Sequence, residues 1–153
     1  MRRRITKPNL TTDDIGNKDI FVFGSNESGL HGGGAAAFAA NELDAKYGCG
    51  FGHTGSTFAI PTKDWFIDTL PLYVIEFYIK RFLQYVEECP NLKFRVTQIG
   101  CGLAGYQPKH IAPLFWPAVS MKNVWLPQEF WDILFPKTKI KQNYEQERIS
   151  KTV

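Results

Sequence analysis

The sequence predicts an α/β domain with three layers, α/β/α, around a mostly parallel central sheet. Short apolar runs of strand length alternate with helical segments, and this alternation favours strands joined by crossover helices. The run Ile20 to Phe23 is apolar throughout, as is typical of a strand buried on both faces. Two of the predicted strands run directly into glycine clusters.

In the first half of the chain, the strand at 20–23 stops at Gly24-Ser25-Asn26. After Gly32 to Gly34, an alanine-rich segment predicts a helix that runs to about Lys46. The segment 47–56 holds four glycines and predicts a loop, and 57–61 predicts a short strand.

In the second half, Pro71 marks the start of a helix that ends near Pro90. Its apolar residues recur at spacings of three and four, which indicates an amphipathic helix; they are Ile75, Ile79, Phe82, Leu83 and Val86. The remaining predicted elements are a strand at 94–99, a helix from Pro108 to about Phe115, a strand at 123–126 and helical turns at 127–135.

The length and composition predict one domain. A folded chain of 153 residues removes roughly 70% of its extended surface from water, and 44% of the residues are hydrophobic. We expect residues 1–18 to form a basic segment with a possible edge strand, residues 19–136 to form the domain, and residues 137–153 to form a polar, basic and frayed tail.

The charge of +3 comes from the two ends of the chain, so we expect the basic ends to aid solubility and expect no specific nucleic-acid partner. The three cysteines have no zinc-site spacing, and no apolar run approaches the ~20 residues that cross a bilayer. We therefore expect a cytoplasmic protein without a metal, a cofactor or a membrane partner. The oligomeric state stays open.

The two glycine clusters, Gly32 to Gly34 and Gly100 to Gly105, follow strands. The carboxyl ends of parallel strands lie at one edge of a sheet, where ligands bind, so both clusters should face one crevice. Glycines let backbone N–H groups approach a phosphate, and a helix N-terminus adds positive partial charge. A tight turn that packs the helix on the sheet is the alternative interpretation of either cluster alone. No G-x-G-x-x-G fingerprint follows the first strand, no acidic residue stands where a ribose would need one, and the Gly-Lys-Ser/Thr of the Walker loop is missing.

The full string Val22 to Ala36 resembles the macrodomain motif, in which a strand ends at an Asn and a triple glycine follows six residues later. Its His-Gly-Gly-Gly form is similar to viral macrodomains that act on ADP-ribose-1″-phosphate. Ile99 to Tyr106 resembles the second macrodomain loop, which wraps the diphosphate and the distal ribose. The resemblance covers residues 19 to 130, and in particular it is to short macro-like proteins of phages and bacteria.

The resemblance implies an ADP-ribose site. Asn26 would bind the distal ribose, His31 would lie beside its anomeric end, and Tyr106 would pack on the ribose or a phosphate. The adenine would need an acidic residue, for which Asp13, Asp14 and Asp19 are candidates. The implied ligand-binding residues are Gly24, Ser25, Asn26, Gly32, Gly33, Gly34, Ala35, Gly100, Cys101, Gly102, Leu103, Ala104, Gly105 and Tyr106.

The implied catalytic residues are Asn26, His31 and Lys63. Hydrolases of the mono-ADP-ribosyl type carry an Asp after the triple glycine, where this chain has Ala35 and Ala36. In a second subgroup, which resembles the terminal ADP-ribose glycohydrolases, Lys63 matches a catalytic Lys, but Ala104 replaces the partner Asp.

Single residues also have simpler interpretations. Lys63 and Asp64 form a solvated loop pair more often than a catalytic one, and His53 and His110 are expected at the surface. Cys101 is expected to be a small packing residue rather than a nucleophile. His31 is expected to have little core to fill between glycines, and its imidazole suits proton transfer near neutrality.

Three functions remain open at this stage. The first is an enzyme that removes the terminal phosphate of ADP-ribose-1″-phosphate or cleaves an ADP-ribosyl bond. The second is a non-catalytic binder that sequesters an ADP-ribose-derived signal or an ADP-ribosylated partner, as in phage counter-defence. The third is a different nucleotide-binding α/β protein with convergent glycine loops.

Overall fold

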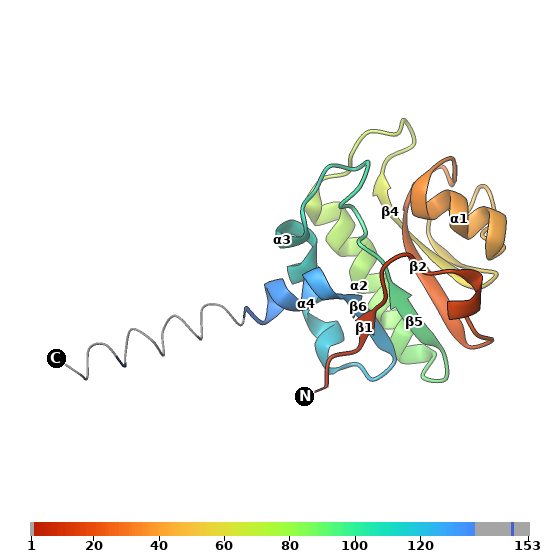
Figure 1. The fold of residues 1–153 in the computed structure, drawn as a ribbon. Coiled ribbons are helices and arrows are strands. Elements are labelled where there is room, and N and C mark those ends of the chain that lie inside the picture. Colours follow the sequence, from red (N-terminus) through yellow and green to blue (C-terminus); the bar gives the residue numbers. More distant parts are fainter. Residues whose placement is uncertain (1, 137–147, 149–153) are drawn as a thin grey trace.

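The computed structural model describes residues 2–136 and residue 148, and in this part of the chain a six-stranded, mostly parallel sheet carries four α-helices (Figure 1). The strands are β1 (Ile5–Thr6), β2 (Asp19–Asn26), β3 (Gly52–Thr54), β4 (Thr57–Lys63), β5 (Lys93–Val96) and β6 (Val124–Pro127). The helices are α1 (Gly34–Glu42), α2 (Leu72–Glu88), α3 (Pro108–Ile111) and α4 (Gln128–Leu134), with 3₁₀ helices at Thr12–Asp14 and Ala112–Ser120.

The strand order is β1-β6-β5-β2-β4-β3. All neighbouring strands are parallel except β3, which pairs antiparallel with β4. β2 lies between β5 and β4, so its carboxyl end at Gly24 to Asn26 is central in the sheet. The predicted mostly parallel sheet is therefore confirmed.

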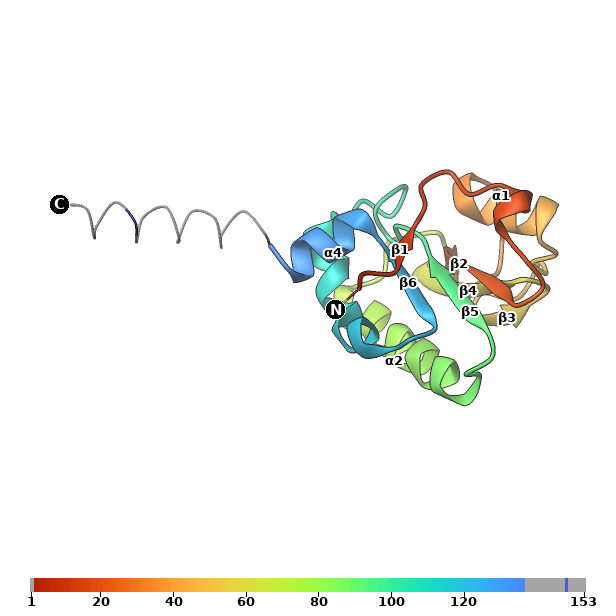
Figure 2. The same cartoon turned by 60° about the horizontal axis from the view of Figure 1, so that its bottom comes forward.

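Alternation along β2 divides the core into two parts, because successive side chains of a strand point to opposite faces. Ile20 and Val22 pack with the buried side of α2 and with residues of α4, whereas Phe21 and Phe23 pack with Ala36 and Ala39 of α1. Helices thus cover both faces of the sheet, with α1 across the sheet from α2, α3 and α4 (Figure 2).

Several boundaries differ from the predicted ones. The segment 47–56 contains β3 and is not only a loop. α1 ends at Glu42 rather than near Lys46, and the helix at 108–115 is a short α3 followed by a 3₁₀ segment that includes Pro117. The amphipathic helix α2 and the last strand lie within one or two residues of their predicted positions.

The N-terminal segment belongs to the fold. β1 is an edge strand paired with β6, as the sequence allowed. The Arg3 guanidinium lies over the Trp131 ring and forms an ion pair with Asp132, and Arg4 donates to the carbonyl of Val124. Arg3 and Arg4 therefore make structural contacts, and the solubility role expected of the basic ends stays a prediction. The predicted tail at 137–153 lies outside the described residues except for residue 148.

Within the described residues, no helix combines the length and apolar character that a membrane span requires.

Candidate functional site

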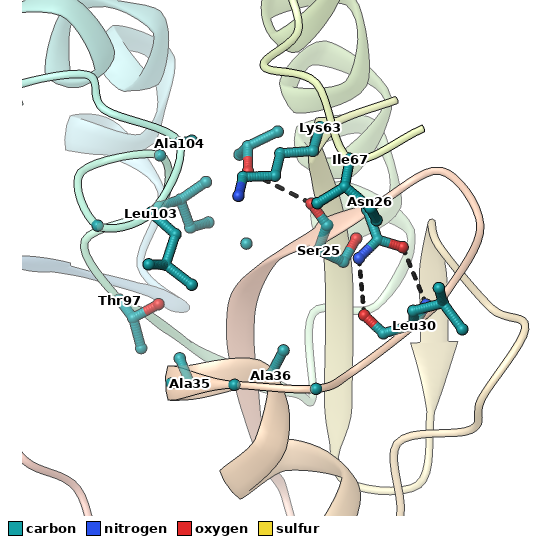
Figure 3. A pocket seen from close by; sticks show the side chains of 18 of the residues that line it. Ser25, Asn26, Leu30, Ala35, Ala36, Lys63, Ile67, Thr97, Leu103 and Ala104 are labelled. Atoms are coloured by element: carbon teal, nitrogen blue, oxygen red, sulfur yellow. Dashed lines mark hydrogen bonds between the residues drawn. The ribbon is translucent and has the colours of Figure 1, made fainter. Parts of the chain in front are cut away.

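A cavity of about 390 Å³ lies at the carboxyl ends of β2, β4 and β5 (Figure 3), within the size range of ligand pockets. The first glycine loop, which holds Gly32 to Gly34, and the start of α1 form one wall. The second glycine loop, Gly100 to Gly105, forms another. The lining residues are Gly24, Ser25, Asn26, Leu30, Gly32, Gly33, Gly34, Ala35, Ala36, Thr62, Lys63, Ile67, Thr97, Gln98, Ile99, Gly100, Gly102, Leu103 and Ala104. We call this space the glycine cavity.

A second hollow, of about 560 Å³, adjoins the glycine cavity. The two share four lining residues, Gly34, Ala35, Thr97 and Gln98. The second hollow extends over the ends of β1 and β6 and is lined in addition by Thr6, Lys7, Pro8, Asn9, Leu10, Phe21, Phe38, Pro127, Gln128 and Glu129. Together the two spaces run along the carboxyl edge of the sheet from β6 to β4. We call this second space the side hollow.

Three glycines of the cavity have neither a conformational nor a packing reason to be glycine. Gly32, Gly33 and Gly102 are not among the residues with positive φ. A Cβ atom at Gly32 or Gly102 would meet no protein atom within 4 Å, and at Gly33 it would meet only the Leu103 side chain at 4.0 Å. The positions that side chains would occupy here are therefore open, and all three glycines line the cavity.

A Cβ atom at Gly24, which also lines the cavity, would make ordinary contacts of 3.5 Å with Gly100 and Thr62. Three further glycines near the site have internal reasons to be glycine. Gly100 has φ +76, and a Cβ there would lie 3.1 Å from the Ile111 side chain. Gly34 and Gly105 also have positive φ, although their surroundings are open. These three glycines shape the loops, because L-residues rarely adopt positive φ.

Lys63 is the one ionisable side chain among the described residues that line the glycine cavity. It extends from the end of β4 into the cavity (Figure 3), and within the described chain its ammonium group has no hydrogen-bond or ion-pair partner. The expected pair with Asp64 does not form. The Asp64 carboxylate instead accepts the backbone N–H groups of Phe66 and Asp68, at 2.8 and 3.0 Å.

Asn26 lines the cavity, but most of its hydrogen-bonding capacity is used within the loop. Its Oδ1 accepts from the Leu30 N–H, and its Nδ2 donates to the Leu30 carbonyl at 2.7 Å (Figure 3). The same Oδ1 also accepts from Ser28 Oγ. One N–H of the amide remains for a ligand. Asn26 therefore orders the turn that precedes the triple glycine.

His31 does not line either space, and the expectation that it has little core to fill is wrong. Its side chain is 1% exposed and packs against the rings of Phe23 and Tyr47. Nε2 lies 3.0 Å from the Lys46 carbonyl, and because a carbonyl only accepts, this nitrogen carries the proton. Nδ1 is buried without a partner. His31 is thus a core residue that fastens the loop to residues 46 and 47.

Three predicted ligand-binding residues also do not line the glycine cavity: Cys101, Gly105 and Tyr106. The Tyr106 hydroxyl donates to the Leu70 carbonyl at 2.6 Å, which anchors the second glycine loop. Burial, with a smaller contribution from Glu129, raises the pKa of the Cys101 thiol to about 11. The thiol is protonated near neutral pH, which agrees with the packing role expected for it.

None of the predicted adenine-binding acids lines the side hollow. Asp19 is at the amino end of β2 and pairs with Arg95 at 3.1 Å. The Asp14 carboxylate accepts the Thr11 N–H and pairs with Lys7, and these contacts lower its pKa. Asp13 is exposed on the same 3₁₀ turn.

The acidic residue that does line the side hollow is Glu129. It stands two residues after the end of β6, so it lies at the same edge as the glycine loops. The sequence could have indicated this residue, because residues just after a parallel strand lie at that edge and a strand is predicted at 123–126. Thr97 and Gln98, which follow β5, lie there for the same reason.

The other two histidines lie outside both spaces. His53 is exposed and contacts the Tyr85 hydroxyl at 2.6 Å, and His110 is half-buried beside Tyr106. Within residues 2–136 and 148, no three His, Cys, Asp or Glu side chains gather in a way that could hold a metal ion.

Comparison of the chain with models of protein families, with curated proteins and with solved structures gives no match.

Proposed function

We propose that this chain binds ADP-ribose or a close relative along the carboxyl edge of the sheet, with the diphosphate between the two glycine loops. The observation that carries the proposal is the set of cavity-facing glycines, Gly32, Gly33 and Gly102, where neither φ nor protein packing calls for glycine. A ligand that contacts the backbone itself explains the missing side chains, because only glycine lets a phosphate reach the N–H groups.

The electrostatics of the cavity support an anionic ligand. The N-terminus of α1 begins at Gly34, on the cavity wall, and its unpaired N–H groups and dipole favour negative charge. The Lys63 ammonium adds a full positive charge, and no carboxylate belongs to the described lining of the glycine cavity. A diphosphate matches this arrangement.

The extent of the two spaces supports a ligand longer than a mononucleotide. The ends of β6, β5, β2 and β4 are consecutive in the sheet, and three spacings of about 4.8 Å give a width of about 14 Å. An adenosine joined through a diphosphate to a second ribose can extend over this width. A mononucleotide would fill only one of the two spaces.

The side hollow supports a nucleobase at one end of the ligand. Phe21, Phe38 and Leu10 give it apolar surface, and Gln98, Gln128 and Glu129 add hydrogen-bonding groups. A flat, mostly apolar ring with polar edges suits such a lining. In an adenine complex, the Glu129 carboxylate would accept a hydrogen bond from the exocyclic amino group.

Binding without turnover is the form of this function that the cavity favours. A general acid or base must reach the reacting atoms, and His31 is buried behind the loop rather than in the cavity. Lys63 is the one ionisable group available among the described lining residues. Any phosphatase or glycosidase activity would therefore depend on Lys63.

Calorimetric titration with ADP-ribose and with AMP tests the proposal. We expect a Kd for ADP-ribose of at most about 1 μM, equivalent to about −8 kcal/mol, and much weaker binding of AMP, which lacks the second ribose and one phosphate. Gly33→Val and Gly102→Val should each weaken binding strongly, since a branched side chain on either loop would fill the diphosphate site. No heat at millimolar ADP-ribose, or unchanged binding in both folded variants, would contradict the proposal.

Incubation of the parent protein with ADP-ribose-1″-phosphate separates a binder from an enzyme. A binder releases no phosphate above a buffer blank at high protein concentration. Release that disappears in Lys63→Met would instead assign a reaction to this cavity.

A further inference from the structure

The loop 64–69, between β4 and α2, carries two aromatic side chains that no part of the described protein covers. Trp65 is 67% exposed and Phe66 is 86% exposed. The next residue, Ile67, lines the glycine cavity beside Lys63. Neither Lys63 nor Ile67 lines the side hollow. The aromatic pair therefore adjoins the end of the glycine cavity that lies away from the side hollow.

Hydrogen bonds hold this loop in one conformation. The Asp64 carboxylate accepts two backbone N–H groups of the loop, from Phe66 and Asp68. The Thr69 hydroxyl donates to the Ala104 carbonyl at 2.9 Å, which ties the loop to the second glycine loop across the cavity. The Trp65 and Phe66 rings are therefore presented by an ordered segment, and a ligand that contacts them meets a largely preorganised surface.

The backbone of the loop is also strained where it meets the cavity. Ile67 has φ +66, a region that sterics disfavour for a β-branched residue. Such conformations persist where surrounding contacts impose them, and they concentrate at ligand-binding sites. Here the Ile67 N–H donates to the Asp64 carbonyl, and the strain places the Ile67 side chain in the cavity wall.

The exposure of the rings calls for a partner with aromatic chemistry. Eight aromatic side chains of the described chain are buried, including Phe23, Phe58 and Trp131 at 2% exposure or less, whereas Trp65 and Phe66 are exposed and adjacent in the sequence. Adjacent exposed aromatic groups mark contact sites. The distal ribose of an ADP-ribose unit would lie at this end of the cavity. Whatever its anomeric carbon carries would lie near Ile67, the residue that directly follows Trp65 and Phe66.

We propose that loop 64–69 receives an aromatic base carried on the distal ribose, so that the preferred ligands are dinucleotides with a base at each end rather than ADP-ribose itself. The inference rests on the proposed function, because it takes the diphosphate site as given. Trp65 and Phe66 are then specificity-determining residues. They act on the second base and not on the ADP-ribose part of the ligand.

Titration of the parent with ADP-ribose, NAD and diadenosine diphosphate tests this inference. NAD differs from ADP-ribose by the nicotinamide ring, and diadenosine diphosphate carries adenine in its place. We expect at least one of the two dinucleotides to bind about tenfold more tightly than ADP-ribose, the gain that stacking of one base gives. Binding should also quench the fluorescence of Trp65.

The variant Trp65→Ala/Phe66→Ala should abolish that gain and leave the affinity for ADP-ribose within about twofold of the parent. Trp65→Phe, which keeps an aromatic ring, should retain most of the gain. Tyr73→Ala is the matched control, because Tyr73 is 74% exposed on α2 and lines neither space.

Two results would overturn the inference while leaving the proposed function intact: ADP-ribose binds but neither dinucleotide binds more tightly, or the gain survives in the double variant. Equal loss of affinity for ADP-ribose and the dinucleotides in the double variant would also overturn it, because the rings would then contact the ribose. If no ligand binds to the parent, the proposed function itself fails and the inference falls with it.

Discussion

The two sides of the first glycine loop use glycine for opposite reasons. On the packed side, a Cβ at Gly29 would lie 2.4 Å from the Gly48 carbonyl carbon, and one at Gly50 would lie 2.4 Å from the Asn26 carbonyl oxygen. On the cavity side, a Cβ at Gly32 would meet nothing within 4 Å. The packed glycines are needed for folding, whereas the cavity glycines leave room for something outside the chain.

The polar residues near the site divide in the same way. The hydrogen bonds that the Asn26 amide and His31 Nε2 form are to the chain itself, at Leu30 and at the Lys46 carbonyl respectively. Lys63 lies beside Asn26 in the pairing of β2 with β4, and its ammonium group has no partner within the described chain. A residue that resembles a catalytic group in a motif can therefore serve the fold, and a free group facing the same space is the better candidate for ligand contact.

The largest effect is expected on the packed side. Gly29→Ala should lower the free energy of unfolding by about 3 kcal/mol or more, because the methyl group collides with the backbone of residues 48 and 49 and because φ is +74. Urea denaturation followed by circular dichroism measures the loss. Parent-like stability would show that the loop relaxes freely and that the two sides do not differ.

The next effect concerns His31, on the same side. His31→Ala should cost about 2–4 kcal/mol in stability, because it removes a buried ring between Phe23 and Tyr47 and the hydrogen bond to the Lys46 carbonyl. Thermal denaturation measures this cost. A variant that is as stable as the parent but loses a measured activity would support a chemical role for His31 instead of a structural one.

The strands and long helix of this fold are predictable from local patterns. The apolar run at 20–23 and the spacing of Ile75, Ile79 and Phe82 report burial through neighbouring residues alone. β3 is missed because its three residues lie among glycines and show no alternation of apolar and polar side chains. Its pairing with β4 comes from the hairpin and not from its composition.

The position of the site can also be predicted from local patterns, but the roles of its residues can be predicted only in part. Glycines after strands reach the carboxyl edge whatever the details of the loops, and both clusters do line the cavity. The burial of His31 depends on Lys46 and Tyr47, which are 15 and 16 residues away. No local spacing pattern predicts that contact, and the glycines next to His31 do not indicate that it is buried.

On the cavity side, Gly32→Ala should change binding more than stability. The added methyl group meets no protein atom, and a lower entropy of the unfolded chain can even stabilise the variant by about 0.4–1 kcal/mol. The affinity for ADP-ribose should fall about tenfold, because the methyl group occupies space that the diphosphate needs. Calorimetry and thermal denaturation on the same sample measure both quantities. Loss of stability with unchanged affinity would show that Gly32, like Gly29, is needed for the fold and not for the ligand.

The smallest effect is expected for Lys63→Met, which removes a charge and keeps most of the side-chain volume. The free energy of unfolding should stay within about 0.5 kcal/mol of the parent, because the ammonium has no partner to lose within the described chain. The affinity for ADP-ribose should fall about fivefold at low ionic strength, the effect of one partly solvated ion pair. Added salt should shrink this difference, since salt screens charges that are reached by solvent.

Lys80→Met is the matched control, because Lys80 is exposed on α2, pairs with Glu76 and lines neither space. It should leave the affinity and its salt dependence unchanged. If Lys80→Met and Lys63→Met weaken binding equally, the effect belongs to the overall charge of the protein. A loss confined to Lys63→Met assigns the effect to the cavity, where Lys63 is the one cation among the described lining residues and the glycines leave their side-chain positions open.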